Sequence, residues 1–125
     1  MFIGTVELEV EQALTDRQIQ TGMMFRKTMT DKEGMLFVHP DVRERGYWMN
    51  NVTVPLSIAY INPEGKIVEI HDMQPFDTNS VFSVSQNIQY ALEVPQGWFQ
   101  RKGVVPGAKV MTEKGTLHQT YFRKR

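Results

Sequence analysis

Hydrophobic and polar residues alternate along two stretches of this chain. In residues 5–10, valine and leucine occupy every second position, and a threonine and two glutamates fill the positions between them. Residues 89–94 alternate in the same way, with tyrosine, leucine and valine on one face and Glu93 on the other. Because side chains of a strand point to opposite faces in turn, both stretches are predicted to be half-buried strands.

Further strands are predicted where apolar runs end at turn residues. The continuous apolar run 34–38 ends at His39-Pro40, and the run 54–61 carries its proline, Pro55, near its start, where a missing N–H does least harm. The Asn-Pro-Glu-Gly sequence at 62–65 forms a turn that pairs this second strand with residues 66–71. Shorter strands are predicted at 47–49, 109–112 and 116–122.

Two short helices are predicted. Thr15 and Gln18 have the spacing of a capping box, which opens a helix that runs to about Gly22. A second helical segment covers residues 95–102, with Pro95 early and Gly103 as its stop. The longest irregular segment, residues 72–87, is rich in serine, asparagine and aspartate, and loops of this length are usually functional or mobile.

These elements predict a mainly β fold. About seven to eight short strands with two short helices favour a small β-sandwich or a partly open barrel. A chain of 125 residues without repeats or linkers corresponds to a single domain, 1–125, with a C-terminal strand or tail at 111–125.

Composition excludes several classes of function. Lysine plus arginine equals aspartate plus glutamate, 14 each, so the chain lacks the basic surplus that nucleic-acid binding requires. The absence of cysteine excludes disulfides, thiolate zinc sites and cysteine nucleophiles. No apolar run approaches the roughly 20 residues of a membrane helix. We therefore expect neither a nucleic-acid partner nor a membrane span in this chain.

Six motifs occur in a fixed order along most of the chain: GMMFR at 22–26, GMLF at 34–37, WMNN at 48–51, PLSIA at 55–59, MQP at 73–75, and YALEV at 90–94 with Gly97. In order and spacing they resemble the bacterial and archaeal domain-of-unknown-function family 192, over roughly residues 6–110. The resemblance implies a mainly β, sandwich-like fold and no particular activity.

The same resemblance implies a location. Many members of the family look exported, with a signal or lipoprotein leader, so we expect an extracytoplasmic protein, periplasmic or at the cell surface, whose leader is absent from this chain. The alternative location is the cytoplasm.

A cluster of side chains just before the hairpin is the first candidate for a site. Trp48, Met49, Asn50 and Asn51 follow one another where a strand would simply alternate. Tryptophan can stack on a sugar or an aromatic ligand, and asparagine offers both donors and acceptors. We interpret Met49 as a core residue, and we expect Trp48 to cap the core while Asn51 faces a cleft.

Arg26 and Glu93 form the second candidate. If both side chains point inward they should pair, because burial of either charge alone costs several kcal/mol. The pair could be a structural ion pair that fixes the first helix to the sheet. Alternatively, the Arg26 guanidinium could bind a carboxylate, a phosphate or a sugar hydroxyl.

The histidines give no metal site. His71 and Asp72 could act as an acid–base pair, but neighbours in a strand point to opposite faces. His39 and His118 lack the spacing of zinc ligands. Catalytic and cofactor motifs, including the nucleophile elbow and the P-loop, do not occur. We predict no metal and no cofactor, and the sequence assigns no catalytic residue.

These observations favour a small extracytoplasmic binding or accessory module over an enzyme. Its cleft would lie between the end of the first helix, residues 48–51 and the strand that carries Glu93, with residues 72–87 as a mobile rim. Arg26, Trp48, Asn51 and Glu93 are the candidate binding residues, and a carbohydrate or a small anion is the expected ligand. The alternatives are a hydrolase that uses Glu93 or His71 as acid or base, and a protein-interaction module that recruits its partner through the long loop or an edge strand.

Overall fold

The computed structural model describes residues 1–123, and these form eleven strands and three short helices. The strands are β1 (Phe2–Ile3), β2 (Val6–Glu7), β3 (Glu9–Ala13), β4 (Glu33–Arg43), β5 (Gly46–Tyr47), β6 (Leu56–Ile61), β7 (Ile67–Met73), β8 (Val81–Phe82), β9 (Ile88–Pro95), β10 (Val110–Thr112) and β11 (Gly115–Thr116). The helices are α1 (Asp16–Thr21), α2 (Trp98–Lys102) and α3 (Leu117–Tyr121).

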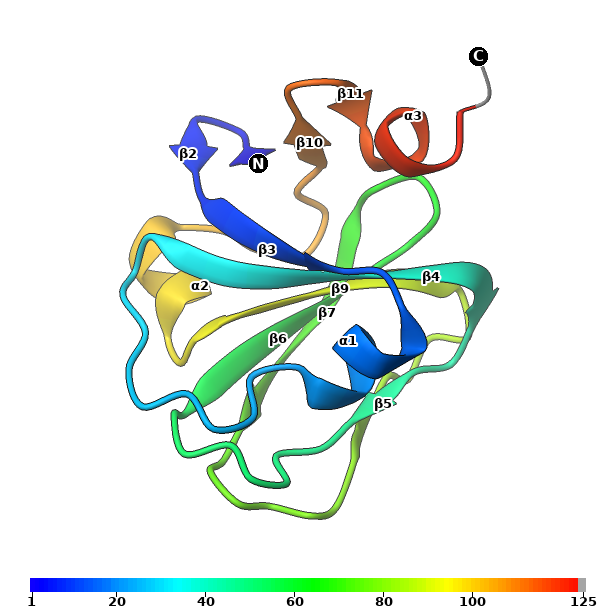
Figure 1. The fold of residues 1–125 in the computed structure, drawn as a ribbon. Helices are drawn as coiled ribbons and strands as arrows, with labels where there is room; N and C mark the ends of the chain where they lie inside the picture. Colours follow the sequence, from blue (N-terminus) through cyan, green and yellow to red (C-terminus); the bar gives the residue numbers. More distant parts are fainter. Residues whose placement is uncertain (124–125) are drawn as a thin grey trace.

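A five-stranded sheet in the order β3-β4-β9-β6-β7 forms the centre of the molecule. Its pairs are antiparallel except for β3 with β4, which run parallel. A four-stranded sheet, β11-β10-β1-β2, lies above the central sheet with α3, and α1 and β5 lie below it (Figure 1). The fold is therefore mainly β and sandwich-like, as the sequence predicts.

The central strands are covered on both faces. All six residues of β6 are buried, and so are the first seven of β9. A strand covered on both sides has no polar face, which explains the nearly continuous apolar sequence of these strands.

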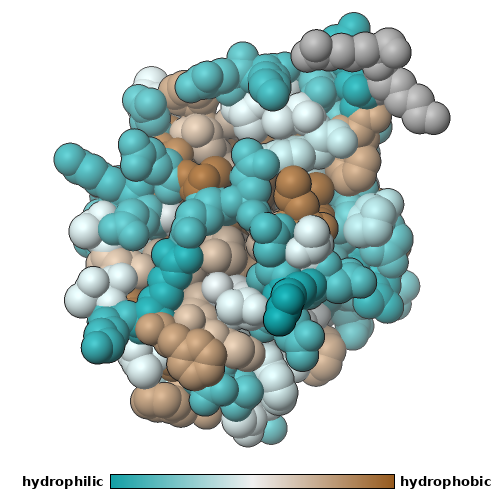
Figure 2. All heavy atoms as spheres, in the orientation of Figure 1, coloured by the Kyte–Doolittle hydropathy of each residue, from teal (hydrophilic) through white to brown (hydrophobic). Residues whose placement is uncertain are grey.

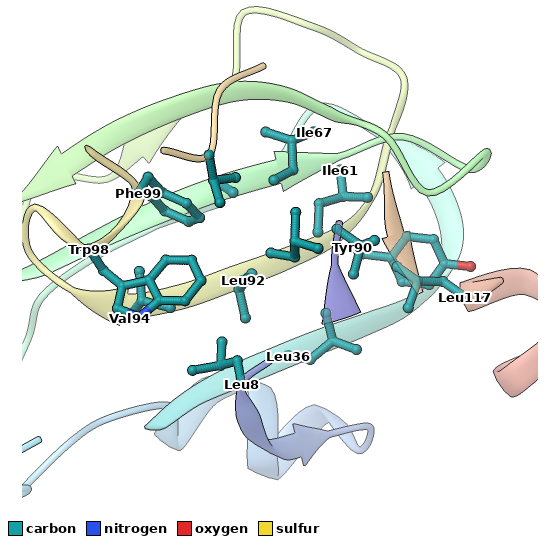
Figure 3. Packing of buried hydrophobic residues seen from close by; sticks show 14 of the residues in the cluster. Leu8, Leu36, Ile61, Ile67, Tyr90, Leu92, Val94, Trp98, Phe99 and Leu117 are labelled. Carbon is teal, nitrogen blue, oxygen red and sulfur yellow. The ribbon is translucent and has the colours of Figure 1, made fainter. Parts of the chain in front are cut away.

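Two hydrophobic clusters lie on the two faces of the central sheet. We call the first the closed core (Figure 3); it contains Ile3, Leu8, Leu36, Val38, Ala59, Ile61, Ile67, Tyr90, Leu92, Val94, Trp98, Phe99, Val104, Val110 and Leu117. We call the second the cavity-side core; it contains Ala13, Met23, Met35, Phe37, Tyr47, Met49, Val52, Leu56, Ile58, Tyr60, Met73, Ile88 and Ala91.

The predicted capping box of α1 is confirmed. The Thr15 hydroxyl accepts from the backbone N–H of Gln18, and the Gln18 side chain accepts from the N–H of Thr15 in return. The helix ends at Thr21, and Gly22 forms its C-cap.

The prediction of a strand over residues 116–122 is wrong, because Leu117–Tyr121 form helix α3. Thr116 and Gln119 make a second capping box with the same Thr-x-x-Gln spacing as the first. Two satisfied N-terminal amides favour the helix over an extended chain. Lys124 and Arg125, the end of the predicted C-terminal segment, lie outside the described residues.

The structure also has more elements than the seven to eight strands and two helices that the sequence predicts. The second predicted helix is shorter, because α2 begins only at Trp98. No helix among residues 1–123 is long and apolar enough to cross a membrane.

Candidate functional site

A cavity of about 600 Å³ opens beneath the cavity-side core. Its walls come from the end of α1, from β4, β5 and β8, and from the loop 48–52, and Glu93 of β9 contributes to its lining. These segments are distant in sequence, and the sheet brings them together.

Glu93 is the most unusual residue of this cavity. Strand register places it directly opposite Met35 on β4 and Ile58 on β6, so its side chain shares their face of the sheet. The residue is only 4% exposed, and no described residue forms a hydrogen bond or an ion pair with its carboxyl. Burial raises the pKa of Glu93 to about 8, so the side chain is a neutral carboxylic acid at pH 7.

Aromatic side chains pack next to Glu93 on this face of the sheet. Ala91 is the next residue of β9 on the same face, and it lies opposite Phe37 and Tyr60. The ring of Tyr47 packs over these two residues, with centroid distances of 4.9 Å to Phe37 and 6.0 Å to Tyr60. Glu93 and Tyr47 therefore line neighbouring parts of one cavity wall.

His39 and Tyr47 form a hydrogen-bonded pair in the same wall, between the His39 Nε2 atom and the Tyr47 hydroxyl. Burial, assisted by the charge of Arg45, lowers the pKa of His39 to about 4. Burial and the charge of Glu93 raise the pKa of Tyr47 well above its usual value. At pH 7 the wall therefore presents uncharged hydrogen-bonding groups.

The cationic side chains of the cavity are already engaged. Arg45 donates to the backbone carbonyl and the carboxylate of Asp41, the latter at 2.7 Å, and to the carbonyl of Ile88. Arg43 is exposed and lies 3.6 Å from the second carboxylate oxygen of Asp41. Asp41 offsets one of the two arginine charges, and the carboxylate of Glu44, which lines the same cavity, offsets the other, which leaves little attraction for an anionic ligand.

Two exposed aromatic side chains, Trp48 and Phe82, line the cavity where it meets solvent. Phe82 lies opposite Gly46 in the β5–β8 pair, and its ring rests against the glycine backbone. A Cβ atom at residue 46 would overlap the Phe82 ring. Glycine at this position is therefore what allows the ring to lie beside the cavity.

Of the four predicted binding residues, Trp48 and Glu93 line this cavity and Arg26 does not. The predicted pairing of Arg26 with Glu93 is wrong, because the Arg26 guanidinium pairs with Glu11 of the edge strand β3. Arg26 and Glu11 line a separate cavity of about 350 Å³, which also contacts Met35, the cross-strand neighbour of Glu93. Arg26 therefore pairs with an exposed carboxylate at the sheet edge, outside the apolar core.

Asn51 does not face the cavity either. Its φ of 59° turns the backbone into the left-handed region, and its side chain is exposed, while the preceding Asn50 lines the cavity. Met49 is buried in the cavity-side core, as predicted. The amide with access to the cavity is therefore one residue earlier than the sequence suggests.

His71 and Asp72 point to different partners. The His71 Nε2 atom lies 2.8 Å from a carboxylate oxygen of Glu69, and Asp72 accepts a hydrogen bond of 2.9 Å from the Ser57 hydroxyl. His71 is not part of the cavity lining. No group of three acidic or histidine side chains among residues 1–123 could hold a metal ion.

Residues 72–87 form part of the cavity rim through Ser80 and Phe82. This segment is less irregular than the sequence suggests, because it contains β8 and is anchored at several points. The backbone N–H of Met49 donates to the carbonyl of Asp77 at 2.7 Å, and the Tyr60 hydroxyl donates to the carbonyl of Val81.

Sequence reasoning missed His39, Tyr47, Gly46 and Phe82 as cavity residues. The alternation of β9 does place Glu93 away from the closed core, so that residue could be found. The contact between His39 and Tyr47 depends on the path of residues 44–45 between β4 and β5, and that of Gly46 with Phe82 depends on a pairing across 36 residues. No local pattern signals either contact.

Comparison with known proteins supports the fold. The family model DUF192, described as "Uncharacterized ACR", matches residues 2–112. A crystal structure of a protein from Sinorhizobium meliloti 1021, described as a candidate transcription regulator, is 34% identical, with a TM-score of 0.78 over 82% of this chain and 79% of that one.

A second crystal structure, of a protein of unknown function from Novosphingobium aromaticivorans DSM 12444, is 28% identical. Its TM-score is 0.78, over 82% of this chain and 73% of that one. No functionally curated protein matches the sequence.

Proposed function

The chain belongs to the uncharacterized domain-of-unknown-function family 192, and we propose that its cavity binds a small, uncharged ligand that carries hydroxyl groups, such as a carbohydrate. The observation that carries this proposal is the buried, unpartnered carboxyl of Glu93. Among the ligands that the sequence suggests, the carbohydrate suits the cavity better than a small anion does.

The Glu93 carboxyl is costly to the fold. Burial removes most of the solvation of this carboxyl, and its cross-strand neighbours Met35 and Ile58 are apolar. A methionine or leucine at the same position would avoid that cost. Natural proteins retain such destabilising residues mostly at functional sites.

A ligand hydroxyl would satisfy both oxygens of a neutral carboxyl, since the acid can donate through its O–H and accept through its carbonyl. Trp48 and Phe82 supply aromatic surfaces at the cavity mouth, which suit the apolar face of a sugar ring. An anion would find Arg43 and Arg45 already engaged by Asp41.

The proposed location is extracytoplasmic, and the resemblance to exported family members is its only support. Fractionation of cells that express the native gene tests it directly. The role described for the Sinorhizobium meliloti protein is not extended to this chain, because equal numbers of acidic and basic residues disfavour a nucleic-acid partner.

A hydrolase is the second candidate function, with Glu93 rather than His71 as the general acid. A carboxyl with a pKa of about 8 is protonated at neutral pH and can donate a proton to a leaving group. Glu44 lines the same cavity and is the available second carboxylate.

Ligand titration followed by tryptophan fluorescence tests the binding proposal. The chain has two tryptophans, of which Trp98 is fully buried in the closed core and Trp48 lies at the cavity. A change in emission on addition of neutral sugars therefore reports on Trp48. Sugar phosphates and sugar acids should bind more weakly than the neutral sugars.

Three variants sharpen this test. Glu93→Leu should abolish binding, whereas Glu93→Gln should retain it, because the amide keeps one donor and one acceptor. Arg26→Gln, outside the cavity, is the control and should bind as the wild type does. If no neutral sugar changes the fluorescence, or if Glu93→Leu binds normally, the proposal is wrong.

Turnover of glycosides distinguishes the second candidate. A hydrolase should lose its turnover in Glu93→Gln while it still binds the sugar, since the amide cannot transfer a proton. A pure binding module shows no turnover in either protein.

A further inference from the structure

Two phenylalanines stand exposed in an unusual backbone conformation. Phe25 is 73% exposed with a φ of 65°, and Phe76 is 63% exposed with a φ of 62°. Glycine and asparagine adopt positive φ readily, but a bulky side chain in this region is a genuine outlier.

The two residues are held by one loop. The backbone N–H of Phe25 donates to the carbonyl of Asn51 at 2.9 Å, and that of Phe76 donates to the next carbonyl, of Val52, at 3.1 Å. Asn51 also has a positive φ. Two consecutive carbonyls thus fix both phenylalanines, so their backbones lie close together although 51 residues separate them in sequence.

The three loops form one end of the molecule. The connections after α1, after β5 and after β7 meet at the bottom of Figure 1, on the opposite side from β1, β10 and α3. In the same orientation, tan side chains are exposed at this lower end among pale and teal ones (Figure 2).

Neither the stability of the fold nor the solubility of the protein explains why phenylalanine occupies these two positions. Each position carries backbone strain that glycine or asparagine would relieve, and each ring remains in water. A side chain that strains the backbone and exposes an apolar ring to water suggests an intermolecular contact in which a partner covers the ring.

The residues next to the two rings carry little charge; farther along the connection that holds Phe25, Asp31 pairs with Arg101 and Lys32 begins the approach to β4. Residues 48–55 contain no charged side chain, and Asp77 is the one acidic residue in 74–80. Beside Phe25, Arg26 is paired with Glu11, which leaves Lys27 as the one charged residue of 25–28 without an ion pair in the structure. Uncharged amides and hydroxyls flank the rings, and such groups can hydrogen-bond to lipid headgroups without the cost of inserting a charge.

The exposed apolar area of the two rings limits the kind of partner that can cover them. Two rings of this exposure offer on the order of 300 Å² of apolar surface, since a phenylalanine buries roughly 150–250 Å². A stable protein interface needs about 800 Å² from each partner. A pair of aromatic loop tips is sufficient for reversible insertion at a membrane surface, where aromatic side chains are enriched.

We propose that this end of the molecule, through Phe25 and Phe76, attaches reversibly to a lipid bilayer surface. The rings enter the boundary between headgroups and acyl chains, and the polar loop residues remain at headgroup level. The proposal is independent of the cavity and of its ligand.

Flotation with lipid vesicles tests the attachment. The protein is mixed with vesicles of phosphatidylcholine alone, and with vesicles of equal parts phosphatidylcholine and phosphatidylglycerol, at low and at high salt. Because apolar insertion is the driving force, we expect the wild type to float with both kinds of vesicle and to remain bound at high salt.

The double variant Phe25→Asn, Phe76→Asn is the decisive one. Asparagine suits positive φ, so the variant should be at least as stable as the wild type while its vesicle binding falls at least about tenfold. Val84→Asn with Val105→Asn is the matched control, because these valines are 86% and 63% exposed on other loops. The control should bind as the wild type does.

Three results would overturn the proposal. The wild type could stay with the soluble fraction, or the double asparagine variant could float normally. Binding that occurs only on the anionic vesicles and disappears at high salt would assign the attachment to basic residues instead of to the two rings.

Discussion

The two faces of strand β9 differ in what they pack against. Leu92 points into the closed core, where aliphatic and aromatic side chains fill the space between the two sheets (Figure 3). On the opposite face, Glu93 lines a cavity of about 600 Å³. One strand thus borders a filled core on one face and a cavity on the other.

The difference shows how this small fold separates stability from binding. The closed core gains its free energy from apolar burial and has no carboxylate, histidine, lysine or arginine among its members. The cavity side gains less free energy from apolar burial, because it contains an alanine, a carboxyl without a partner among the described residues and a hydrogen-bonded His–Tyr pair. Substitutions on the two faces should therefore have opposite consequences for stability and for ligand binding.

The largest effect is expected in the closed core. Leu92→Ala removes a fully buried side chain and should lower the free energy of unfolding by about 2–5 kcal/mol. Met24→Ala, at a half-buried position in the cavity lining, should cost less than half as much, because less buried surface is lost. Denaturant unfolding measures both. Equal losses would show that the two faces contribute alike.

Glu93→Gln should stabilise the protein at alkaline pH. The pKa of Glu93 is about 8 in the folded state and near 4.5 when exposed, so the unfolded chain loses this proton first as the pH rises. The wild type therefore loses stability between pH 4.5 and 8, and no further above 8. Glutamine has no proton to lose, so the variant should keep that stability.

The difference between the two proteins from pH 6.5 to 9 isolates this effect, because both contain His39, whose folded-state pKa is about 4. Across this pH window the wild type should lose on the order of 2 kcal/mol relative to Glu93→Gln. Chemical denaturation at several pH values gives the difference curve. Parallel curves for the two proteins would mean that Glu93 is ionised in the folded state.

The elements of this fold were predictable where the signal is local. The alternation of β9, the hairpin turn at 62–65 and the Thr15 capping box each depend on residues within one element or turn. Helix α3 has the same Thr-x-x-Gln signal, at Thr116 and Gln119, and reading that pattern consistently would have found it. The chain lacks a strong apolar periodicity there, and its β-branched and aromatic residues favoured the strand.

The cavity was predictable only in part. The position of Glu93 off the apolar face of its strand marks it as unusual, and a tryptophan followed by two asparagines marks the loop. The partner of Arg26 depends on which strand lies at the sheet edge, and nothing in the sequence shows that β3 runs parallel to β4 and presents Glu11. The positive φ of Asn51, which accompanies the exposure of its side chain while Asn50 lines the cavity, also has no local signal in the sequence.

Two tyrosines offer a smaller test of the same contrast. Tyr90, in the closed core, has a buried hydroxyl without a hydrogen-bond partner among the described residues, whereas the Tyr60 hydroxyl, on the cavity side, donates to the carbonyl of Val81. Tyr90→Phe should be neutral or stabilise by up to about 1 kcal/mol, and Tyr60→Phe should destabilise by about 1–3 kcal/mol. Thermal unfolding of the two variants checks the signs, and a marked loss in Tyr90→Phe would contradict the assignment.

The two capping threonines should give the smallest effects and still separate the two faces. Thr15 caps α1, whose last residues form part of the cavity wall, and Thr116 caps α3, whose Leu117 belongs to the closed core. Each threonine-to-alanine change should cost about 1 kcal/mol, because one N-terminal amide loses its acceptor. Only Thr15→Ala should also weaken ligand binding, since it loosens a cavity wall while Thr116→Ala leaves that wall intact. Matched unfolding and fluorescence titrations of the two variants measure both quantities, and equal binding losses would place the ligand outside the cavity.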